Sequence, residues 1–147
     1  MRSFIKRHPK IFITIVFVVI VLFCYVFDFC ISKSYQFEVV SVSPEVIYAD
    51  PQRPVEITIK LTRYGKAVSG HDLYALPVGE NAAGVFRQNR IRTDEQGLAV
   101  FVYYPYKATM FVPAAPVDIQ IVDESNSILF VINAEFFMVL DIQEGTV

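Results

Sequence analysis

Cysteine is almost absent from the sequence. The two cysteines, Cys24 and Cys30, both lie inside an apolar run near the N-terminus, and none follows residue 31. The rest of the chain therefore cannot hold a disulfide, so its stability has to come from packing. Within the run we expect both cysteines to be small apolar residues of a membrane helix, with lipidation or an inter-chain bridge as the alternative.

Groups that carry out catalysis are also scarce. Beyond the run there is one histidine, His71, and no spacing typical of a metal site. A histidine base needs a nucleophile and an orienting partner, and the sequence places neither beside His71, so we expect it to face solvent. Asp118, Asp123, Glu124 and Asp141 could converge on calcium, but no EF-hand-type loop is present and solvated turns are expected. The sequence predicts a protein that is not an enzyme and that uses no cofactor or metal.

One long apolar run is present, and it predicts a membrane-spanning helix over residues 11–31. From residue 11 to residue 27 its only polar side chain is Thr14. At about 1.5 Å per residue the helix measures roughly 31 Å, which matches a bilayer core of about 30 Å. Asp28 is expected near the outer end, reaching water, with pairing to a charge on another membrane protein as the alternative.

The charges on either side of this run predict its orientation. Arg2, Lys6, Arg7 and Lys10 precede it, whereas only Lys33 lies in the twenty residues after it. Because basic residues favour the cytoplasmic side, residues 1–10 are expected to form a cytoplasmic tail. The run ends in bulky residues, which disfavours a cleaved signal peptide or lipoprotein signal and favours an uncleaved signal anchor in the plasma membrane. A linker at 32–36 and an extracytoplasmic domain at 37–147 would follow.

The predicted outer domain is acidic. From residue 34 onward there are 8 Lys and Arg against 14 Asp and Glu, although the net charge of the whole chain is only -2. Such a surface argues against nucleic acid or anionic lipid as a partner. About 110 residues is also a typical length for one domain with one hydrophobic core.

Short runs rich in β-branched and aromatic residues recur between turn signals after residue 31, and no convincing helical period is present. At 55–61, for example, apolar and polar residues alternate as in a strand with one buried face. Strands are predicted at 37–42, 55–62, 71–76, 85–92, 99–104, 117–122, 128–132 and 136–142. Eight strands in little more than a hundred residues predict an all-β fold, a two-sheet sandwich with one N-terminal helix.

Two turn patterns resemble those of bacterial immunoglobulin-like domains of the invasin and intimin type. The strand at 55–62 followed by G-K-A-V-S-G at 65–70 is similar to that family's strand and G-x-x-V-x-G turn, and T-D-E-Q-G-L-A at 93–99 is similar to its T-D-x-x-G-x-A sequence. Gly65, Gly70 and Gly97 can adopt backbone angles that are unfavourable for other residues, and the Asp94 carboxylate can accept hydrogen bonds from nearby backbone amides. Transthyretin-like and carboxypeptidase regulatory-type sandwiches use the same turn chemistry. The resemblance implies an immunoglobulin-like sandwich of about seven to eight strands.

An aromatic and apolar cluster is the candidate interaction site. Its members are Tyr103, Tyr104, Tyr106, Met110, Phe111 and Val112. Prolines 105 and 113 interrupt the stretch, so a long loop or sheet edge is expected, where apolar groups stay partly exposed and can anchor a protein partner. Alternatively, the cluster caps the open end of the sandwich. Five consecutive apolar residues at 136–140 also place side chains on both faces of a strand, so a neighbouring subunit is expected to cover the outward face.

These features predict a non-catalytic, single-pass membrane protein that presents an immunoglobulin-like domain outside the cytoplasm. We expect it to act as an accessory or scaffolding subunit of a cell-envelope or membrane protein assembly, because the short linker favours contacts close to the bilayer. The expected partners are the lipid bilayer and other membrane or envelope proteins or further copies of the chain, and not nucleic acid. The alternative is a glycan- or peptide-binding module that uses the loops at one end of the sandwich.

Overall fold

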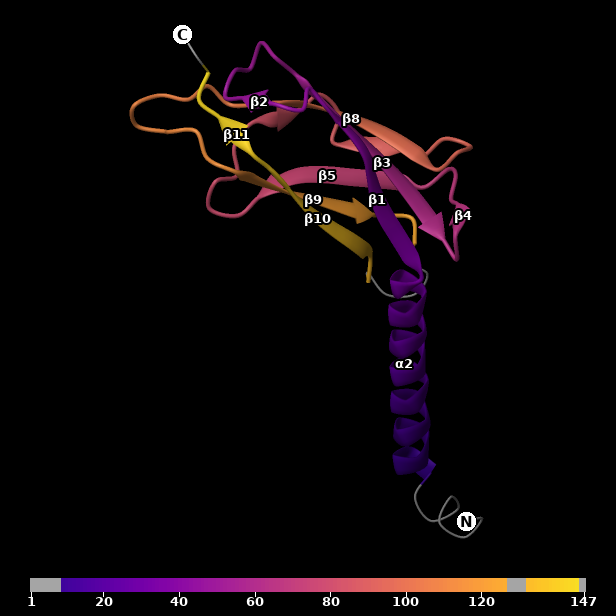
Figure 1. The fold of residues 1–147 in the computed structure, drawn as a ribbon. Coiled ribbons are helices and arrows are strands. Elements are labelled where there is room, and N and C mark those ends of the chain that lie inside the picture. The colour runs from indigo at the N-terminus through magenta and orange to yellow at the C-terminus, as the bar shows by residue number, and fades with distance from the viewer. Residues whose placement is uncertain (1–8, 127–131, 146–147) are drawn as a thin grey trace.

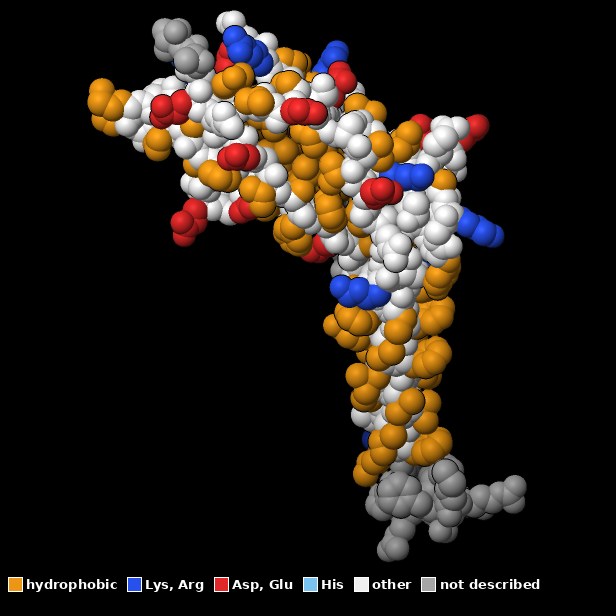
Figure 2. Space-filling model, in the orientation of Figure 1, with side chains coloured by type: hydrophobic (Ala, Val, Ile, Leu, Met, Phe, Trp, Pro, Cys, Tyr) orange, Lys and Arg blue, Asp and Glu red, His pale blue; other side chains and the backbone are white. Residues whose placement is uncertain are grey.

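The computed structural model describes residues 9–126 and 132–145 as one helix joined to a β-sandwich (Figure 1). The helix, α2 (Pro9–Lys33), contains the predicted span at 11–31 and is the one helix in the described ranges that is long and apolar enough to cross a membrane. Its side chains are largely exposed, and Figure 2 shows apolar groups along its visible length. A helix that is apolar all round is typical of a membrane span.

The described strands form two antiparallel sheets and one short parallel pair. The first has the order β1 (Tyr35–Ser43), β3 (Val55–Arg63), β8 (Leu98–Tyr104) and β6 (Val85–Phe86), with β4 (Lys66–Ala67) also paired to β3. The second has the order β10 (Ala134–Leu140), β9 (Val117–Asp123), β5 (Asp72–Val78) and β7 (Arg90–Arg92). A short parallel pair joins β11 (Ile142–Gln143) to β2 (Ile47–Tyr48). The predicted architecture, an immunoglobulin-like β-sandwich with one N-terminal helix, is confirmed.

The core lies between the two sheets and is filled by alternate residues of the central strands. On β3 the inward side chains are Val55, Ile57, Ile59 and Leu61, all fully buried, as the alternation of the sequence predicts. β8 and β9 contribute inward residues with the same period of two. Burial of about 25 cal/mol per Å² of apolar surface makes this alternation the main source of stability in a domain without disulfides.

Most of the predicted strands coincide with observed ones, but the strand predicted at 85–92 is wrong. It divides into β6, which pairs β8 in the first sheet, and β7, which pairs β5 in the second. The chain crosses between the sheets at Arg87 and Asn89, whose backbone groups bond Val102 and Ala75, respectively. Residues 128–131 of the strand predicted at 128–132 lie outside the described residues, and residue 132 belongs to no strand.

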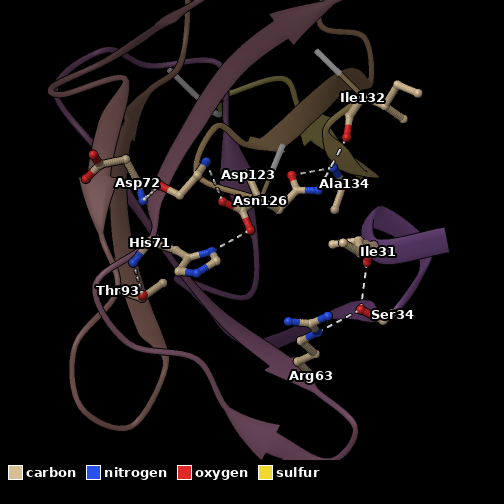
Figure 3. Close-up of polar contacts among 11 residues, drawn as sticks. Ile31, Ser34, Arg63, His71, Asp72, Thr93, Asp123, Asn126, Ile132 and Ala134 are labelled. Carbon is tan, nitrogen blue, oxygen red and sulfur yellow. Dashed lines mark hydrogen bonds and ion pairs between the residues drawn. The ribbon is translucent and has the colours of Figure 1, made fainter. Parts of the chain in front are cut away.

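The helix and the sandwich are joined almost directly. α2 ends at Lys33 and β1 begins at Tyr35, so the linker predicted at 32–36 is reduced to Ser34. The Ser34 backbone N–H and hydroxyl both donate to the carbonyl of Ile31, at 2.9 and 2.6 Å, and Arg63 Nε donates to the Ser34 hydroxyl at 2.9 Å (Figure 3). Asp28 lies near the outer end of the helix, as expected, but its side chain is fully buried and does not reach water.

We call the end of the sandwich that joins α2 the proximal end and the opposite end the distal end. The strand register places Arg63 at the proximal end, because it pairs with Tyr35. Val55, at the other end of β3, pairs with Tyr103 and marks the distal end. Figure 1 shows β2, β11 and the connection from β8 to β9 at the distal end, away from the helix.

Candidate interaction sites

The connection from β8 to β9 ends in a tight turn that we call the distal tip, residues Thr109, Met110, Phe111 and Val112. The Thr109 backbone N–H donates to the Val112 carbonyl at 2.9 Å, and the Val112 N–H donates to the carbonyl and hydroxyl of Thr109, both at 3.1 Å. These bonds hold Met110 and Phe111 at the end of the turn, where they are 92% and 89% exposed. The tip therefore presents two large apolar side chains on a closed backbone.

Tyr106 fastens the base of the tip to the sandwich. Its hydroxyl accepts a hydrogen bond from the Ala115 backbone N–H at 2.7 Å and donates to the Pro113 carbonyl at 3.0 Å, while its ring packs against the core. The two sides of the connection are thus tied together through one side chain. Tyr106, which belonged to the predicted cluster, supports the tip rather than extending its apolar surface.

Tyr103 lies in the core, and its predicted exposure is wrong. It is fully buried, its ring is centred 5.2 Å from that of Phe86, and its hydroxyl donates to the Ala83 carbonyl at 2.6 Å. The physical reason is that β8 is a central strand between β3 and β6 and continues to Tyr104, so alternate side chains point inward. Tyr104 is half-buried, and Val112, like Met110 and Phe111, is exposed. The structure therefore divides the predicted cluster into an exposed tip and buried support.

We expect Tyr103→Phe to change how stability depends on alkaline pH. Burial, with a smaller contribution from Tyr106, raises the pKa of Tyr103 from 10.0 to about 12. Between pH 10 and pH 12 this hydroxyl is ionised in the unfolded chain but neutral in the folded chain. The stability that the neutral, buried hydroxyl contributes is therefore fully present below pH 10 and is lost as pH rises toward 12. Because the variant lacks the hydrogen bond to the Ala83 carbonyl, its free energy of unfolding should be about 1 kcal/mol lower at neutral pH. Urea unfolding of the full chain in micelles should show the two stability curves converging above pH 10, and parallel curves would contradict the expectation.

A cavity of about 580 Å³ lies beside the distal tip. Its lining includes Tyr48, Asp50, Arg53, Lys107, Met110 and Glu144. Arg53 pairs with Asp50 at 3.4 Å and lies over the Tyr48 ring, 5.4 Å from its centroid. An aromatic ring beside groups of both charges is the kind of lining that suits a polar ligand such as a glycan or peptide.

The side of the sandwich formed by β1 and β10 offers a second apolar surface. Within the described residues both strands are sheet edges, each paired on one side only. The rings of Phe37 and Phe136 stack across the gap between the sheets, 5.9 Å apart, while Phe137 and Val139 point outward and are 59% and 61% exposed. Figure 2 shows apolar side chains gathered on the sandwich with acidic groups among them. The run at 136–140 therefore places apolar groups on both faces of β10.

The proximal end is held by a polar cluster around His71 (Figure 3). His71 Nδ1 lies 2.7 Å from Asp123 Oδ2, and the other oxygen of this fully buried carboxylate accepts from the Ser125 N–H at 2.9 Å. The expectation that His71 faces solvent and Asp123 lies in a solvated turn is wrong, because the ends of β5 and β9 pair beside each other. Thr93 accepts from the His71 N–H at 3.0 Å, and the Tyr35 ring lies 5.4 Å from the imidazole. The cluster ties strand ends together.

Other acidic groups at this end take part in surface contacts. Arg92 donates two hydrogen bonds to Asp72, at 2.8 and 2.9 Å, and these hold the pKa of Asp72 below its usual range. Within residues 9–126 and 132–145, no three His, Cys, Asp or Glu side chains converge in a way that could hold a metal ion. Asp94 Oδ1 accepts from the N–H groups of Gln96 and Leu98, at 2.9 and 2.8 Å, and closes the turn that leads into β8. Gly65, Gly70 and Gly97 all have positive φ.

The sequence indicates a hairpin turn at Tyr64, Gly65 and Lys66, which the structure has, but it gives no role to Arg63, which precedes this turn at the proximal end. Tyr64 and Gly65 form the two-residue turn between β3 and β4, and both have positive φ, 51° and 75°. The Arg63 guanidinium lies over the rings of Tyr35 and Tyr64, 5.0 and 5.4 Å from their centroids. The signal available in the sequence was Tyr-Gly in a hairpin turn where Asn-Gly is the common pair.

Comparisons with known proteins give similarities of fold. No protein-family model and no curated protein matches the chain. A solved structure of the D00-D0 domain of intimin is 14% identical with a TM-score of 0.49, and the match covers 71% of this chain and 47% of that structure. The chain thus spans about half the length of the intimin structure.

Two further solved structures are similar. A conjugative transposon lipoprotein from Bacteroides eggerthii is 13% identical with a TM-score of 0.43, over 74% of this chain and 97% of that one. A conjugate transposon protein from Bacteroides vulgatus is 10% identical with a TM-score of 0.42, over 73% of this chain and 83% of that one.

Proposed function

We propose that the chain is a single-pass membrane protein whose α2 spans the bilayer, with residues 1–10 in the cytoplasm and the sandwich outside it. The sandwich then acts without catalysis, as an accessory or scaffolding subunit of a cell-envelope assembly. The apolar, exposed side chains of α2 support the span, because no described part of the sandwich covers most of them. The excess of basic residues before the helix supports the orientation.

The observation that carries the scaffolding role is the distal tip. Met110 and Phe111 are almost fully exposed on a turn that three hydrogen bonds close. Exposed apolar side chains of this size are typical of protein contact sites, and their fixed backbone lowers the entropy lost on binding. Since the tip lies at the end of the sandwich away from α2, its partner is the extramembrane part of another protein rather than lipid (Figure 1).

The direct junction at Ser34 adds to this argument. With one residue between helix and strand, and with Arg63 bonded to that residue, the sandwich cannot move far from the bilayer or turn freely about α2. The tip is then held at one height above the membrane. A domain fixed in this way suits a subunit that contacts its neighbours within one assembly, whereas reaching another cell would require a long stack of domains.

We expect a photoreactive phenylalanine at position 111 of the full chain to crosslink to a specific protein in the native host cells. The matched control is position 100, because Val100 is an exposed apolar residue on the outward face of β8. Phe111→Ser should reduce recovery of the chain in a large complex after mild detergent extraction by about tenfold, the effect of losing one anchor residue at an interface. Equal labelling at both positions, with the chain extracted as a monodisperse monomer, would contradict the proposal.

The distal cavity favours a second candidate function, the binding of a glycan or peptide. Tyr48 and Arg53 provide an aromatic ring and a guanidinium on its wall. If this is the function, position 111 gives no specific protein adduct, and the purified full chain binds envelope glycan or peptide fragments unaided, with weaker binding in Tyr48→Ala. The two candidates therefore give opposite results in the same crosslinking experiment.

A further inference from the structure

The proximal end of the sandwich carries an aromatic and basic group of residues at the level where the helix leaves the bilayer. We propose that Tyr64, Arg63 and Lys33 form a docking surface for phospholipid headgroups, which fixes the sandwich on the membrane; this rests on α2 spanning the bilayer, as proposed above. The surface takes the phosphate layer of the lipid as its ligand, and not a protein or a soluble anion.

The position of this surface follows from the length of α2. Its 25 residues measure about 37 Å, longer than a hydrocarbon core of about 30 Å but shorter than the 40 to 45 Å of a whole bilayer. The apolar run ends at Ile31, so Lys33 and Tyr35 lie in the headgroup layer. Arg63 pairs directly with Tyr35 in the sheet, and the turn at Tyr64 follows it, so both lie at the same level.

Tyr64 combines an unfavourable backbone conformation with a side chain that is largely exposed to solvent. Its φ of 51° is in the left-handed region, where a side chain other than glycine costs roughly 1 to 2 kcal/mol. The residue is also 79% exposed, so it gains little from packing within the domain. Asparagine would suit this turn better. A strained and exposed aromatic residue indicates a role outside folding, and tyrosine rings are typical of the lipid headgroup level.

Arg63 and Lys33 supply the charge that a phosphate needs. The Arg63 guanidinium is held by three contacts, its Nε bond to Ser34 and its position over the rings of Tyr35 and Tyr64. A guanidinium oriented in this way matches the geometry of phosphate oxygens. Lys33 is the last residue of α2, and its Nζ lies 5.6 Å from the Phe29 ring centroid, so its apolar stem follows the helix while its charge lies at the helix end.

This local charge explains how an acidic domain can contact lipid. The net charge of the outer part argues against attraction of the whole domain to an anionic surface. The phosphate group, however, is present in zwitterionic phospholipids as well, and Arg63, Lys33 and the neighbouring Lys66 are concentrated at the proximal end. The acidic Asp72 and Asp123 of this end are already bonded to Arg92 and His71, so contact with the lipid surface depends on the basic groups beside the helix junction.

The chain has no tryptophan, so a single introduced tryptophan reports on its own surroundings. We would place one at position 64, 17 or 111 of the full chain (Tyr64→Trp, Phe17→Trp, Phe111→Trp) and reconstitute each variant in phosphatidylcholine vesicles with brominated acyl chains. Position 17 lies within α2 and position 111 on the distal tip. Emission at positions 17 and 64 should fall at least about twofold, as expected for indole within the bilayer and at its interface, whereas emission at 111 should not change.

The outcomes separate this proposal from the proposed function. Absence of quenching at position 17 would overturn the spanning helix itself. Quenching at 17, with position 64 behaving like position 111, would overturn the docking surface alone. A blue-shifted but unquenched emission at 64 would also overturn it, because that result indicates burial against protein, such as a second copy of the chain.

Tyr64→Asn tests whether the tyrosine is kept for folding. Asparagine tolerates the left-handed backbone, so the variant should be more stable to urea by up to about 1 kcal/mol. A loss of stability in Tyr64→Asn would show that the ring serves the fold and would overturn the assignment of Tyr64 to the lipid.

Discussion

Replacing Gly97 by alanine is expected to lower the free energy of unfolding by about 3 to 4 kcal/mol, because the new methyl group would have no room. A Cβ at this position would lie 2.6 Å from the Leu61 carbonyl oxygen and 3.0 Å from the Val68 nitrogen. These are backbone atoms and cannot rotate away. The Leu61 N–H also donates to the Gly97 carbonyl at 2.8 Å, so moving the turn weakens the contact between β3 and the start of β8.

Gly65→Ala is the matched control. Gly65 has almost the same φ, 75° against 74°, but nothing lies within 4 Å of the position its Cβ would take. Alanine there bears the left-handed backbone cost alone, about 1 to 2 kcal/mol. Urea unfolding of both variants in micelles, followed by circular dichroism, measures the difference that is due to the steric contact. Equal losses in the two variants would show that the contact with Leu61 does not matter.

Asp123→Ala is expected to destabilise the domain by about 3 kcal/mol, because it removes one partner of a buried pair. The carboxylate is fully buried, lies 2.7 Å from His71 Nδ1 and accepts from the Ser125 N–H at 2.9 Å. Alanine leaves both donors without this acceptor at the end where the sandwich joins α2. The loss of stability should therefore appear as a lower free energy of global unfolding and as faster exchange of the Ser125 amide proton.

Two variants act as controls for this prediction. Asp123→Asn keeps a side-chain oxygen for the Ser125 N–H and should lose clearly less stability than Asp123→Ala. Asp72→Ala removes the exposed ion pair with Arg92 and should cost little, because exposed pairs contribute weakly. The interpretation fails if Asp72→Ala and Asp123→Ala destabilise the domain equally.

Local patterns were enough to predict the elements of this fold. The alternation at 55–61 places every second side chain on one face whatever the rest of the chain does, and β3 buries the residues that the pattern selected. The apolar run at 11–31 likewise predicts a helix of membrane-spanning length from composition alone. These properties depend on the period of a strand and the rise of a helix, which are set by the backbone.

Which residues of the candidate sites are exposed, and which contact one another, depended on the pairing of strands that are far apart in the sequence. Tyr103 and Phe111 belong to one apolar cluster in the sequence, yet a central strand turns one ring inward and a closed turn leaves the other exposed. His71 and Asp123 become partners only because β5 and β9 pair.

The sequence by itself determined a β-rich domain, its inward-facing residues and an apolar N-terminal helix, because each follows from the order of apolar and polar residues along a few turns or strands. Only the tertiary structure decided that the linker is a single serine, that Arg63 lies beside it, and that Tyr64 and Phe111 mark opposite ends of the sandwich. The reason is physical: pairings between residues far apart in the chain are selected by the packing of the whole core, which no short stretch of sequence contains.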